Sequence, residues 1–477
     1  MERGEENTVK LDKWGYPVRT SSDACIDAIN SYYIQFLSRG RKTSVILKAV
    51  TDDESCVLAN TLAAYESYQL NLSKSQAYLS SAKSQLKYAT PYEKAVFLAI
   101  SRLVGEDRDD ESAYFLHSAL LAQFPKDLAS LKRGHDLCFF MGQPDKCLSL
   151  VKQVLPQNEE EDYIHGIYCF ALLELGRMAE AEKAARKGLE INKDDIWSQH
   201  GHCHVLQYEC RFEEAAKFME KNSPSWDVCS SFMLTHCWWH LAICYLDGNS
   251  PISKVLSIYD LHIWGELEKS DAIGTQVYLN AIGLLMRVCV RGHANSMGGR
   301  LEKLVGHLTN KSVWHIQWHM DILILWALSS TSKITEAETL LKEMKSKKTN
   351  PSLQKGIQLS EGLLEFGQGN HEKAFKLLGP DFETAEYKVI GASDEQLDVF
   401  NEVWYSVLLN TGRYQIAINQ IQKQIDKTKG VPFLWRLLER GYFLAGREVT
   451  EKARVLESAV SHSWYEKSQR KRTFTEH

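Results

Sequence analysis

The feature of this sequence that most constrains its fold is a residue pattern that returns every 34 positions. Small side chains mark the pattern at Ala113, Cys147, Ala181 and Ala215. A turn residue stands five positions before the last three of them, at Gly142, Gly176 and Cys210. Self-similarity at a fixed period of this length predicts a repeat protein, in which one short supersecondary unit is copied and stacked.

Within one period the apolar residues are spaced three and four apart, which predicts helices and excludes strands. The clearest unit runs from Tyr163 to Lys193. Its first helix ends at Gly176, because a residue without a Cβ enters the left-handed region at no steric cost, and its second helix carries Ala181. This register matches the tetratricopeptide repeat, in which small residues mark the close approach of helix A and helix B.

Two later segments keep the turn-plus-small signature, Gly369 with Ala374 and Gly412 with Ala417. We therefore expect an all-α fold, a right-handed superhelical solenoid of roughly ten to twelve tetratricopeptide-type helix-turn-helix pairs. The predicted ranges are an N-terminal helical capping region at 1–93, core repeats with the 34-residue period at 94–265, degenerate repeats at 266–465 and a basic tail at 466–477.

Composition limits the partners and the compartment. Lys and Arg total 56 against 61 Asp and Glu, a formal net charge of −5, so the chain lacks the general basic character of proteins that bind nucleic acid or anionic membranes. The eleven cysteines form no C-x-x-C pair, the N-terminus has no signal-peptide region, and no apolar stretch is long enough to span a bilayer. We expect a soluble cytoplasmic protein with no nucleic-acid and no membrane partner.

Histidines spaced four apart form the one constellation that could carry chemistry. They occur as three pairs: His200/His204, His236/His240 and His315/His319. Four residues is close to one helical turn, so each pair is expected to project from one helix face with Cβ atoms about 5–6 Å apart. In the repeat register the first pair occupies positions of helix A that line the inner, concave wall. We expect the first two pairs to face one groove.

Two interpretations of these histidines stay open. Paired imidazoles suit a shared metal ion, so His200, His204, His236 and His240 could bind zinc or iron, with Asp136, Asp260 or Asp271 as a further ligand or base. Against a metal, the pairs lack the glutamate of the H-E-x-x-H motif. The other interpretation is that they are hydrogen-bonded groove residues packed among tryptophans, with no cofactor.

Other residues at the inner positions of helix A point to a polar ligand. Arg102, Lys132 and Asp136 occupy those positions in earlier units, which would make that part of the wall cationic and suited to an anionic ligand or an extended peptide. Trp238 and Trp239 are adjacent and cannot both point inward, so Trp239 is a candidate binding anchor. The asparagine of a chaperone-binding carboxylate clamp is missing at these positions, which disfavours a chaperone adaptor.

Several stretches resemble the tetratricopeptide repeat protein 38 family. They are Gly134-His135-Asp136, Tyr163 to Phe170, Asp195 to His200, Trp239-His240-Leu-Ala, Ile258 to Ile263 and Ser270-Asp271-Ala272. The resemblance covers most of the chain and is strongest from about residue 113 to 290. It implies a soluble α-helical repeat protein and implies no established reaction.

The function that the sequence favours is a non-catalytic scaffold that binds a peptide, protein or small polar ligand in its concave groove. The expected ligand-binding residues are Arg102, Lys132, Asp136, His200, His204, His236, Trp239 and His240. No catalytic residue is assigned, because phosphate-binding loops and nucleophile elbows are missing. The alternative is a metal-dependent enzyme or metal-binding protein that uses the four paired histidines. The oligomeric state does not follow from the sequence.

Overall fold

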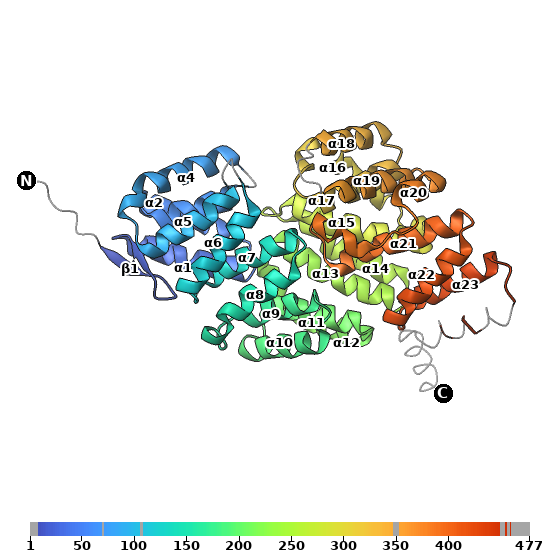
Figure 1. Ribbon diagram of the computed structural model, residues 1–477, viewed down its shortest axis with the longest axis horizontal. Coiled ribbons are helices and arrows are strands. Elements are labelled where there is room, and N and C mark those ends of the chain that lie inside the picture. The colour runs from blue at the N-terminus through green and yellow to red at the C-terminus, as the bar shows by residue number, and fades with distance from the viewer. Residues whose placement is uncertain are drawn as a thin grey trace, which may run out of the picture. The chain divides into compact units, whose positions relative to one another are not determined.

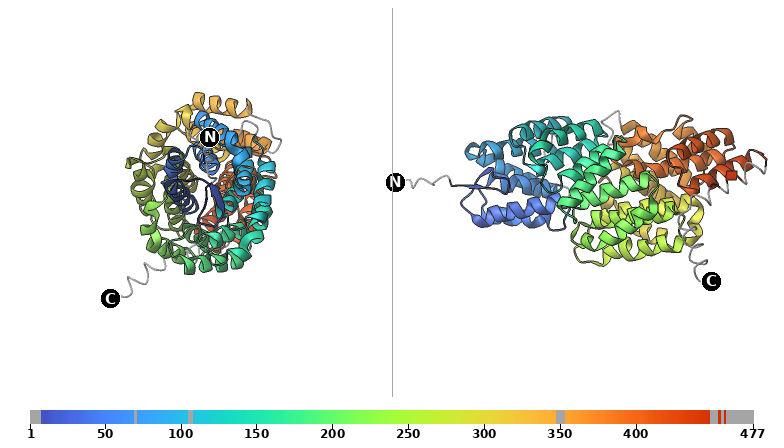
Figure 2. Two further views of the ribbon diagram at one scale, coloured as in Figure 1. Left: turned by 90° about the vertical axis from the view of Figure 1, so that its left-hand side faces the viewer. Right: turned by 90° about the horizontal axis from the view of Figure 1, so that it is seen from below.

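The computed structural model describes residues 8–68, 71–104, 108–346, 353–448, 454–455 and 458. Its elements are almost entirely helical (Figures 1 and 2). None of the helices in these ranges combines the length and the apolar character that a membrane crossing requires.

The elements of the first half of the chain, in order, are β1 (Val9–Leu11), β2 (Pro17–Arg19), α1 (Asp23–Leu37), α2 (Ile46–Asp52), α3 (Val57–Ser67), α4 (Leu72–Gln85), α5 (Pro91–Val104), α6 (Asp110–Gln123), α7 (Leu128–Phe140), α8 (Pro144–Val154), α9 (Ile164–Leu173), α10 (Met178–Ile191), α11 (Ile196–Tyr208) and α12 (Phe212–Asn222). Those of the second half are α13 (Ser231–Asp247), α14 (Ile252–Ile258), α15 (Gly274–Val288), α16 (Arg300–Leu308), α17 (Trp318–Ser330), α18 (Ile334–Ser346), α19 (Leu353–Gly367), α20 (His371–Leu378), α21 (Asp394–Asn410), α22 (Tyr414–Lys427) and α23 (Pro432–Leu444).

The turn between helix A and helix B repeats in detail. Gly142, Gly176 and Cys210 all adopt positive φ, at 66°, 72° and 58°. The backbone N–H that follows each of them donates to a carbonyl five residues earlier: Gln143 to Cys138, Arg177 to Leu172 and Arg211 to Leu206. This is the Schellman end of a helix, which satisfies otherwise unpaired carbonyls. The 34-residue period therefore corresponds to one repeated backbone geometry.

The small residues of the period lie where two helices meet. Ala113, Ala181 and Ala215 have no exposed surface, and Cys147 is 4% exposed. The predicted C-terminal units behave alike: Ala374 and Ala417 are fully buried, and Gly369 and Gly412 have φ of 79° and 75°. The prediction of an all-α solenoid of tetratricopeptide-type helix pairs is confirmed.

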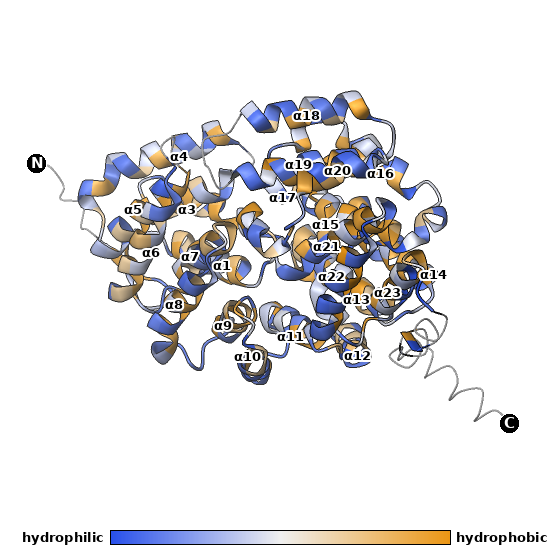
Figure 3. Ribbon diagram, turned by 45° about the vertical axis from the view of Figure 1, so that its right-hand side comes forward, coloured by the Kyte–Doolittle hydropathy of each residue, from blue (hydrophilic) through white to orange (hydrophobic). Residues whose placement is uncertain are grey.

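The outer helices are amphipathic. Apolar and polar residues alternate along α10, α12 and α18 (Figure 3), and α10 buries Ala181, Ala184, Ala185 and Gly188 on one face. A helix of this kind gains stability by burying its apolar stripe against the preceding helix A while its charged face stays in water.

A short antiparallel hairpin of β1 and β2, with Val9 opposite Arg19, was not foreseen from the sequence. It is held to the helices by polar contacts: Thr90 Oγ1 donates to Pro17 O over 2.8 Å, and Lys126 N donates to Tyr16 Oη over 2.8 Å. The hairpin thus covers the N-terminal helices, in the place where an array of stacked units needs a terminal cap.

The packing divides the chain into two units. The first comprises residues 1–202 and 228–230, and the second comprises residues 203–227 and 231–477. The division falls within α11, which continues from one unit into the other. It differs from the predicted range boundaries at 93/94 and 265/266, which stay predictions, and the predicted basic tail at 466–477 lies outside the described residues.

A buried charge cluster fixes three helices of the second unit. Arg291, on the segment after α15, contacts Asp247 at the end of α13 (2.7 Å) and Glu402 on α21 (2.6 Å). Arg287 on α15 reaches the same Glu402 carboxylate over 3.3 Å. Because breaking a buried pair leaves an uncompensated charge, these contacts hold α21 against α13 and α15.

A close approach of α9 to α11 in the first unit depends on Gly166. A Cβ at this position would lie 2.4 Å from the Cβ of Trp197 and 2.6 Å from the backbone N of Ser198, so α9 would have to move away from α11. We expect Gly166→Ala to lower the free energy of unfolding by about 1–3 kcal/mol, the usual cost of overpacking, as measured by urea denaturation followed by tryptophan fluorescence.

The matched control is Gly306→Ala on α16, where an added Cβ meets no atom within 4 Å. Alanine is the better helix former, so this variant should be neutral or more stable by up to about 1 kcal/mol. Equal destabilisation of both variants would contradict the role assigned to the α9–α11 contact.

Candidate functional site

In the first unit, two cations share one carboxylate. Asp136 Oδ1 lies 3.0 Å from Arg39 Nη2, and Asp136 Oδ2 lies 2.8 Å from Lys132 Nζ. Lys132 and Asp136 are one turn apart on α7, as the sequence predicted, whereas Arg39 comes from the turn after α1. The sum of the three formal charges is +1.

Burial controls the protonation of this group. The Lys132 side chain has no exposed surface, and those of Asp136 and Arg39 are 17% and 29% exposed. Burial, and then the nearby Arg39 charge, lowers the pKa of Lys132 to about 7 in spite of Asp136. Burial alone raises the pKa of Asp136, but Arg39 and Lys132 outweigh it, so that its pKa lies well below the ordinary value.

Aromatic rings complete the surroundings of the two cations. Lys132 Nζ lies 4.5 Å from the ring centroid of Phe36 and 5.4 Å from that of Trp197. The guanidinium of Arg39 lies 4.8 Å from the Trp197 ring, whose Nε1 donates to Leu37 O over 3.1 Å. Such cation–π contacts stabilise desolvated charges. Of the three charged side chains, that of Arg39 is the most exposed, at 29%.

The backbone of Arg39 is itself unusual. Its φ is 54°, a left-handed conformation that glycine or asparagine ordinarily adopts at a helix end. Its carbonyl accepts a hydrogen bond from Ser230 N over 2.6 Å. The conformation directs the side chain toward Asp136 and Trp197. The N–H of Gly40 donates to Gln35 O over 2.8 Å, so α1 ends in the same Schellman geometry as the helix A turns described above.

Arg102, the remaining cation predicted for the ligand site, lies in the last turn of α5 and is exposed. None of the contacts that join Arg39, Lys132 and Asp136 involves it. Its role in ligand binding stays a prediction.

The structure brings the paired histidines of α11 and α13 together. One nitrogen from each of His200, His204, His236 and His240 lies within 4.8 Å of the others. His204, His236 and His240 belong to the second unit, and His200 stands one turn before His204 on α11. We call these four residues the imidazole cluster.

The imidazole cluster is closed to solvent, which corrects the expectation of an open groove at these residues. The exposed fractions are 4% for His200, 1% for His204, 5% for His236 and 0% for His240. Trp239, expected as an exposed anchor, is 3% exposed, and its ring stacks on His236 with centroids 5.5 Å apart. A peptide cannot contact these side chains in this conformation.

A chain of hydrogen bonds fixes the tautomer of His236. The hydroxyl of Thr235 has a single proton, which it donates to Ser231 O over 2.6 Å. Its oxygen therefore accepts a hydrogen bond from Asn280 Nδ2, at 2.8 Å. The amide oxygen of Asn280 therefore faces His236 Nδ1, at 2.9 Å, and accepts its proton. In the neutral ring the lone pair is then on Nε2.

Hydrogen bonds to Gln207 fix the tautomer of His240 in the same way. Gln207 Nε2 donates to the backbone O of His240 over 3.3 Å, so Gln207 Oε1 accepts from His240 Nδ1 over 2.7 Å. The lone pair of His240 is again on Nε2. The two Nε2 atoms lie 3.2 Å apart, so two neutral rings would direct lone pairs at each other.

A carboxylate supports a third ring of the cluster. Glu395 Oε1, at the start of α21, lies 2.7 Å from His204 Nδ1. Burial alone raises the pKa of Glu395, but the neighbouring His204 outweighs it and holds the pKa below the usual range. Buried His319, 2% exposed, is a further neighbour, because burial and then the charge of His236 lower its pKa to about 3.

Two details of the predicted histidine chemistry are wrong. His315 and His319 do not share a helix face, because α17 begins only at Trp318 and His315 has a φ of 62°. The predicted acidic partners are also engaged elsewhere or exposed. Asp260 pairs with Arg300 over 2.6 Å, and Asp271 lies on the surface. The carboxylate beside the rings is that of Glu395.

Sequence reasoning missed several contributors: Arg39, Gln207, Asn280 and Glu395. Gln207 could have been found, because it lies three residues after His204 on the same helix face. Arg39, Asn280 and Glu395 come from elements far away in the sequence, and no spacing rule relates them to the residues that they contact.

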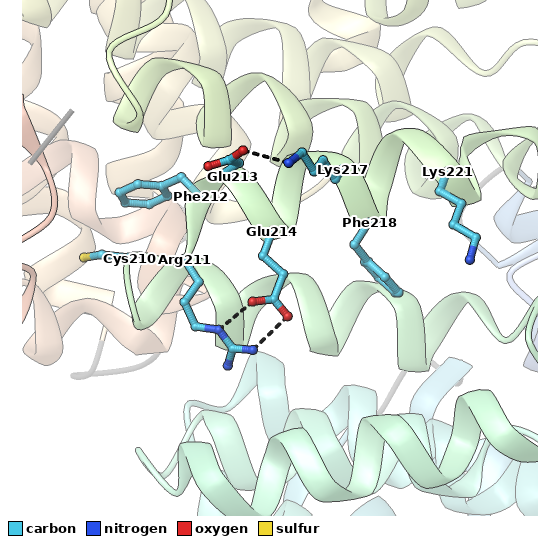
Figure 4. A pocket seen from close by; sticks show the side chains of 8 residues that line it. All are labelled: Cys210, Arg211, Phe212, Glu213, Glu214, Lys217, Phe218 and Lys221. Carbon is cyan, nitrogen blue, oxygen red and sulfur yellow. Dashed lines mark hydrogen bonds and ion pairs between the residues drawn. The ribbon is translucent and has the colours of Figure 1, made fainter. Parts of the chain in front are cut away.

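A surface hollow of about 670 Å³ lies along α12 (Figure 4). Four of its five charged residues pair with each other, Arg211 with Glu214 over 2.8 Å and Lys217 with Glu213 over 2.7 Å. It shares no residue with the imidazole cluster or with the Arg39–Lys132–Asp136 group, and we assign it no function.

No known protein-family model matches the chain. Solved structures of helical-repeat proteins are similar to it. Human IFIT1, a dimer with m7Gppp-AAAA, is 12% identical over 90% of this chain and 95% of that one, with a TM-score of 0.42. The APC/C hetero-tetramer Cut9–Hcn1 is 12% identical over 88% of this chain and 75% of that one, with a TM-score of 0.44. Likeness at this level concerns the fold and says nothing of a shared site.

The expectation that the chain has no nucleic-acid partner is wrong, because it excluded a whole class of ligand. It rested on the net charge of −5. Human IFIT1, a helical-repeat protein to which the chain is similar, is solved with m7Gppp-AAAA, a capped RNA. A charge summed over the whole chain does not exclude a local cationic site, so the net charge cannot support that exclusion.

We expect Asp136→Asn to lower the free energy of unfolding by about 3 kcal/mol, the lower end of the cost of breaking a buried ion pair, because it leaves the buried ammonium of Lys132 without its partner. Chemical denaturation measures the change. The double variant Lys132→Met/Asp136→Asn should recover part of the loss, since no buried ammonium then remains. Additive effects of the two substitutions would contradict the pairing.

Proposed function

We propose that this protein is a non-catalytic, tetratricopeptide-type scaffold that binds the carboxylate of a peptide or small polar ligand at Arg39 and Lys132. The observation that carries the proposal is the excess positive charge of a largely buried site. Arg39 and Lys132 have one counterion between them, Asp136, at 3.0 and 2.8 Å.

Electrostatics favours an anion at this position. Two charges a few ångströms apart interact several times more strongly in a partly buried site than in water. A ligand carboxylate beside Arg39 would neutralise the surplus charge. Arg39 is suited to receive it, because its side chain is 29% exposed and a guanidinium binds carboxylates in a planar, bidentate manner.

Lys132 acts through its charge, since its side chain is fully buried beneath Arg39 and Trp197.

Several observations disfavour catalysis. Ser130 Oγ lies 2.6 Å from His117 Nδ1, a contact of the kind found in serine hydrolases, but both residues are 1% exposed and a substrate cannot reach them. The imidazole cluster is similarly closed, whereas a catalytic metal site keeps an open coordination position. A scaffold whose polar residues serve binding and stability is the simpler account.

We further propose that the chain belongs to the tetratricopeptide repeat protein 38 family and acts in the cytoplasm. The first proposal rests on the resembling stretches, of which Tyr163 to Phe170 and Asp195 to His200 lie in the best-formed repeats. The second rests on the cysteines. All eleven are free and nine are buried, as in proteins of a reducing compartment.

A peptide library tests the proposal. Full-length protein is immobilised and exposed to peptides with a free C-terminal carboxylate and to the same peptides with an amidated C-terminus. We expect the carboxylate set alone to be retained. Arg39→Gln should weaken binding about tenfold to a hundredfold, because hydrogen bonds to charged groups contribute about 1.5–3 kcal/mol.

Arg177→Gln is the control, since Arg177 is an exposed cation of the same unit that pairs with Glu180. Equal retention of free and amidated peptides would contradict a carboxylate site. Retention of an RNA oligonucleotide in place of the peptides, lost in Arg39→Gln, would assign the same cations to a phosphate ligand and refute the peptide proposal.

Binding should also depend on pH. The pKa of Lys132 is about 7 without ligand, and an added anion favours the protonated amine. Affinity should therefore fall as the pH rises through about 7, because the neutral amine no longer attracts the ligand. Titrations of a retained peptide at about pH 6 and 8, below and above that pKa, measure the effect. In Lys132→Met the affinity should be weaker and nearly independent of pH over this range.

A further inference from the structure

We propose that His200, His204, His236 and His240 bind one divalent transition-metal ion, zinc by preference, as a closed structural centre. This site goes beyond the proposed ligand binding and uses none of its residues. Imidazole nitrogen is a ligand that zinc, iron, copper and nickel share.

The Nε2 lone pairs of His236 and His240 are directed at each other. The amide oxygens of Asn280 and Gln207 accept the Nδ1 protons of His236 and His240 at 2.9 and 2.7 Å. Both rings therefore present Nε2 lone pairs to the same point, and Nε2 lies 3.2 Å from Nε2. Two lone pairs at this distance repel, so a cation has to lie between them: either a shared proton or a metal ion.

Geometry favours the metal ion. Two nitrogens bound to tetrahedral zinc at about 2.0–2.1 Å lie about 3.3 Å from each other, close to the 3.2 Å separation seen here. A shared proton explains two rings, whereas nitrogens of four rings lie within 4.8 Å of one another. The more distant nitrogens have to move closer by up to about 1.5 Å to complete a tetrahedron of that size.

The outer contacts are those of metal-binding histidines. Such a ring usually donates its second N–H to a carbonyl oxygen or a carboxylate, which fixes its orientation and raises its basicity. Asn280 and Gln207 supply amide oxygens to two rings, and Glu395 lies 2.7 Å from Nδ1 of a third, His204. The carboxylate also offsets the positive charge that the ion would bring into a buried site.

Burial assigns the centre a structural role. Four protein ligands with 0–5% exposure leave no coordination position for substrate, as in structural zinc sites. An ion here would join α11 to α13, and through Asn280 and Glu395 its ligands are braced by α15 and α21.

Metal analysis of the full-length protein, purified without a histidine tag, tests this inference. We expect about one zinc ion per chain by mass spectrometry, the content of a single four-ligand site. The double variant His236→Gln/His240→Gln should lose it. His165→Gln is the matched control, because His165 is a buried histidine bonded to a backbone carbonyl, Glu159 O, outside the cluster, and should keep the full metal content.

A second variant keeps the test valid if the double variant does not fold. Asn280→Ala removes only the outer contact of His236 and should weaken metal affinity about 10- to 100-fold, measured by titrating metal-free protein with Co2+ and following the ligand-field bands of a tetrahedral nitrogen site. Iron in place of zinc would keep the site and change the assigned metal.

Two results would overturn the inference. Natively folded wild-type protein that contains no stoichiometric transition metal, and that binds no Co2+ after chelator treatment, would leave a shared proton as the cation between His236 and His240. Equal metal content in the double variant and in wild type would place the bound metal elsewhere. Neither result would affect the peptide-binding test at Arg39.

Discussion

The structure of this chain depends on how closely two helices can approach each other within one repeat. The approach needs a small side chain at the crossing and a left-handed residue at the turn, and both return every 34 positions. The same limit holds between successive repeats: at Gly166 on α9, beside Trp197 on α11, there is no space for a single added carbon. Because each pair buries its apolar side only against its neighbours, this local geometry determines how the whole array packs.

Close packing has a consequence for the polar residues on the inner helices. In an open solenoid such residues would face a groove. In this chain other elements of the same unit cover them: the end of α1 lies over Lys132 and Trp197, and α21 lies over His204. Their chemistry is therefore determined by internal partners, and a charge or ring nitrogen at these positions has to be satisfied within the fold.

The two sites satisfy that requirement to different extents. Asp136 neutralises only one of the two cations beside it, which leaves a demand for an external anion at the exposed edge of Arg39. In the imidazole cluster the amide oxygens of Asn280 and Gln207 accept the Nδ1 protons of His236 and His240 and direct the two Nε2 atoms toward each other, which leaves a demand for a cation. The excess charge of each site thus indicates what it would bind.

The sequence by itself determined the helical repeat, its turns and its small-residue crossings, because these depend on residues at most 34 positions apart and on backbone sterics. It also identified Lys132, Asp136 and the two histidine pairs, since helical spacing places each pair on one face. Only the tertiary structure decided that the groove at the histidines is closed, that Arg39 joins Lys132, and that Asn280 and Glu395 brace the rings. These contacts join residues 44 to almost 200 positions apart, and their formation depends on how whole helices pack, which no local pattern encodes.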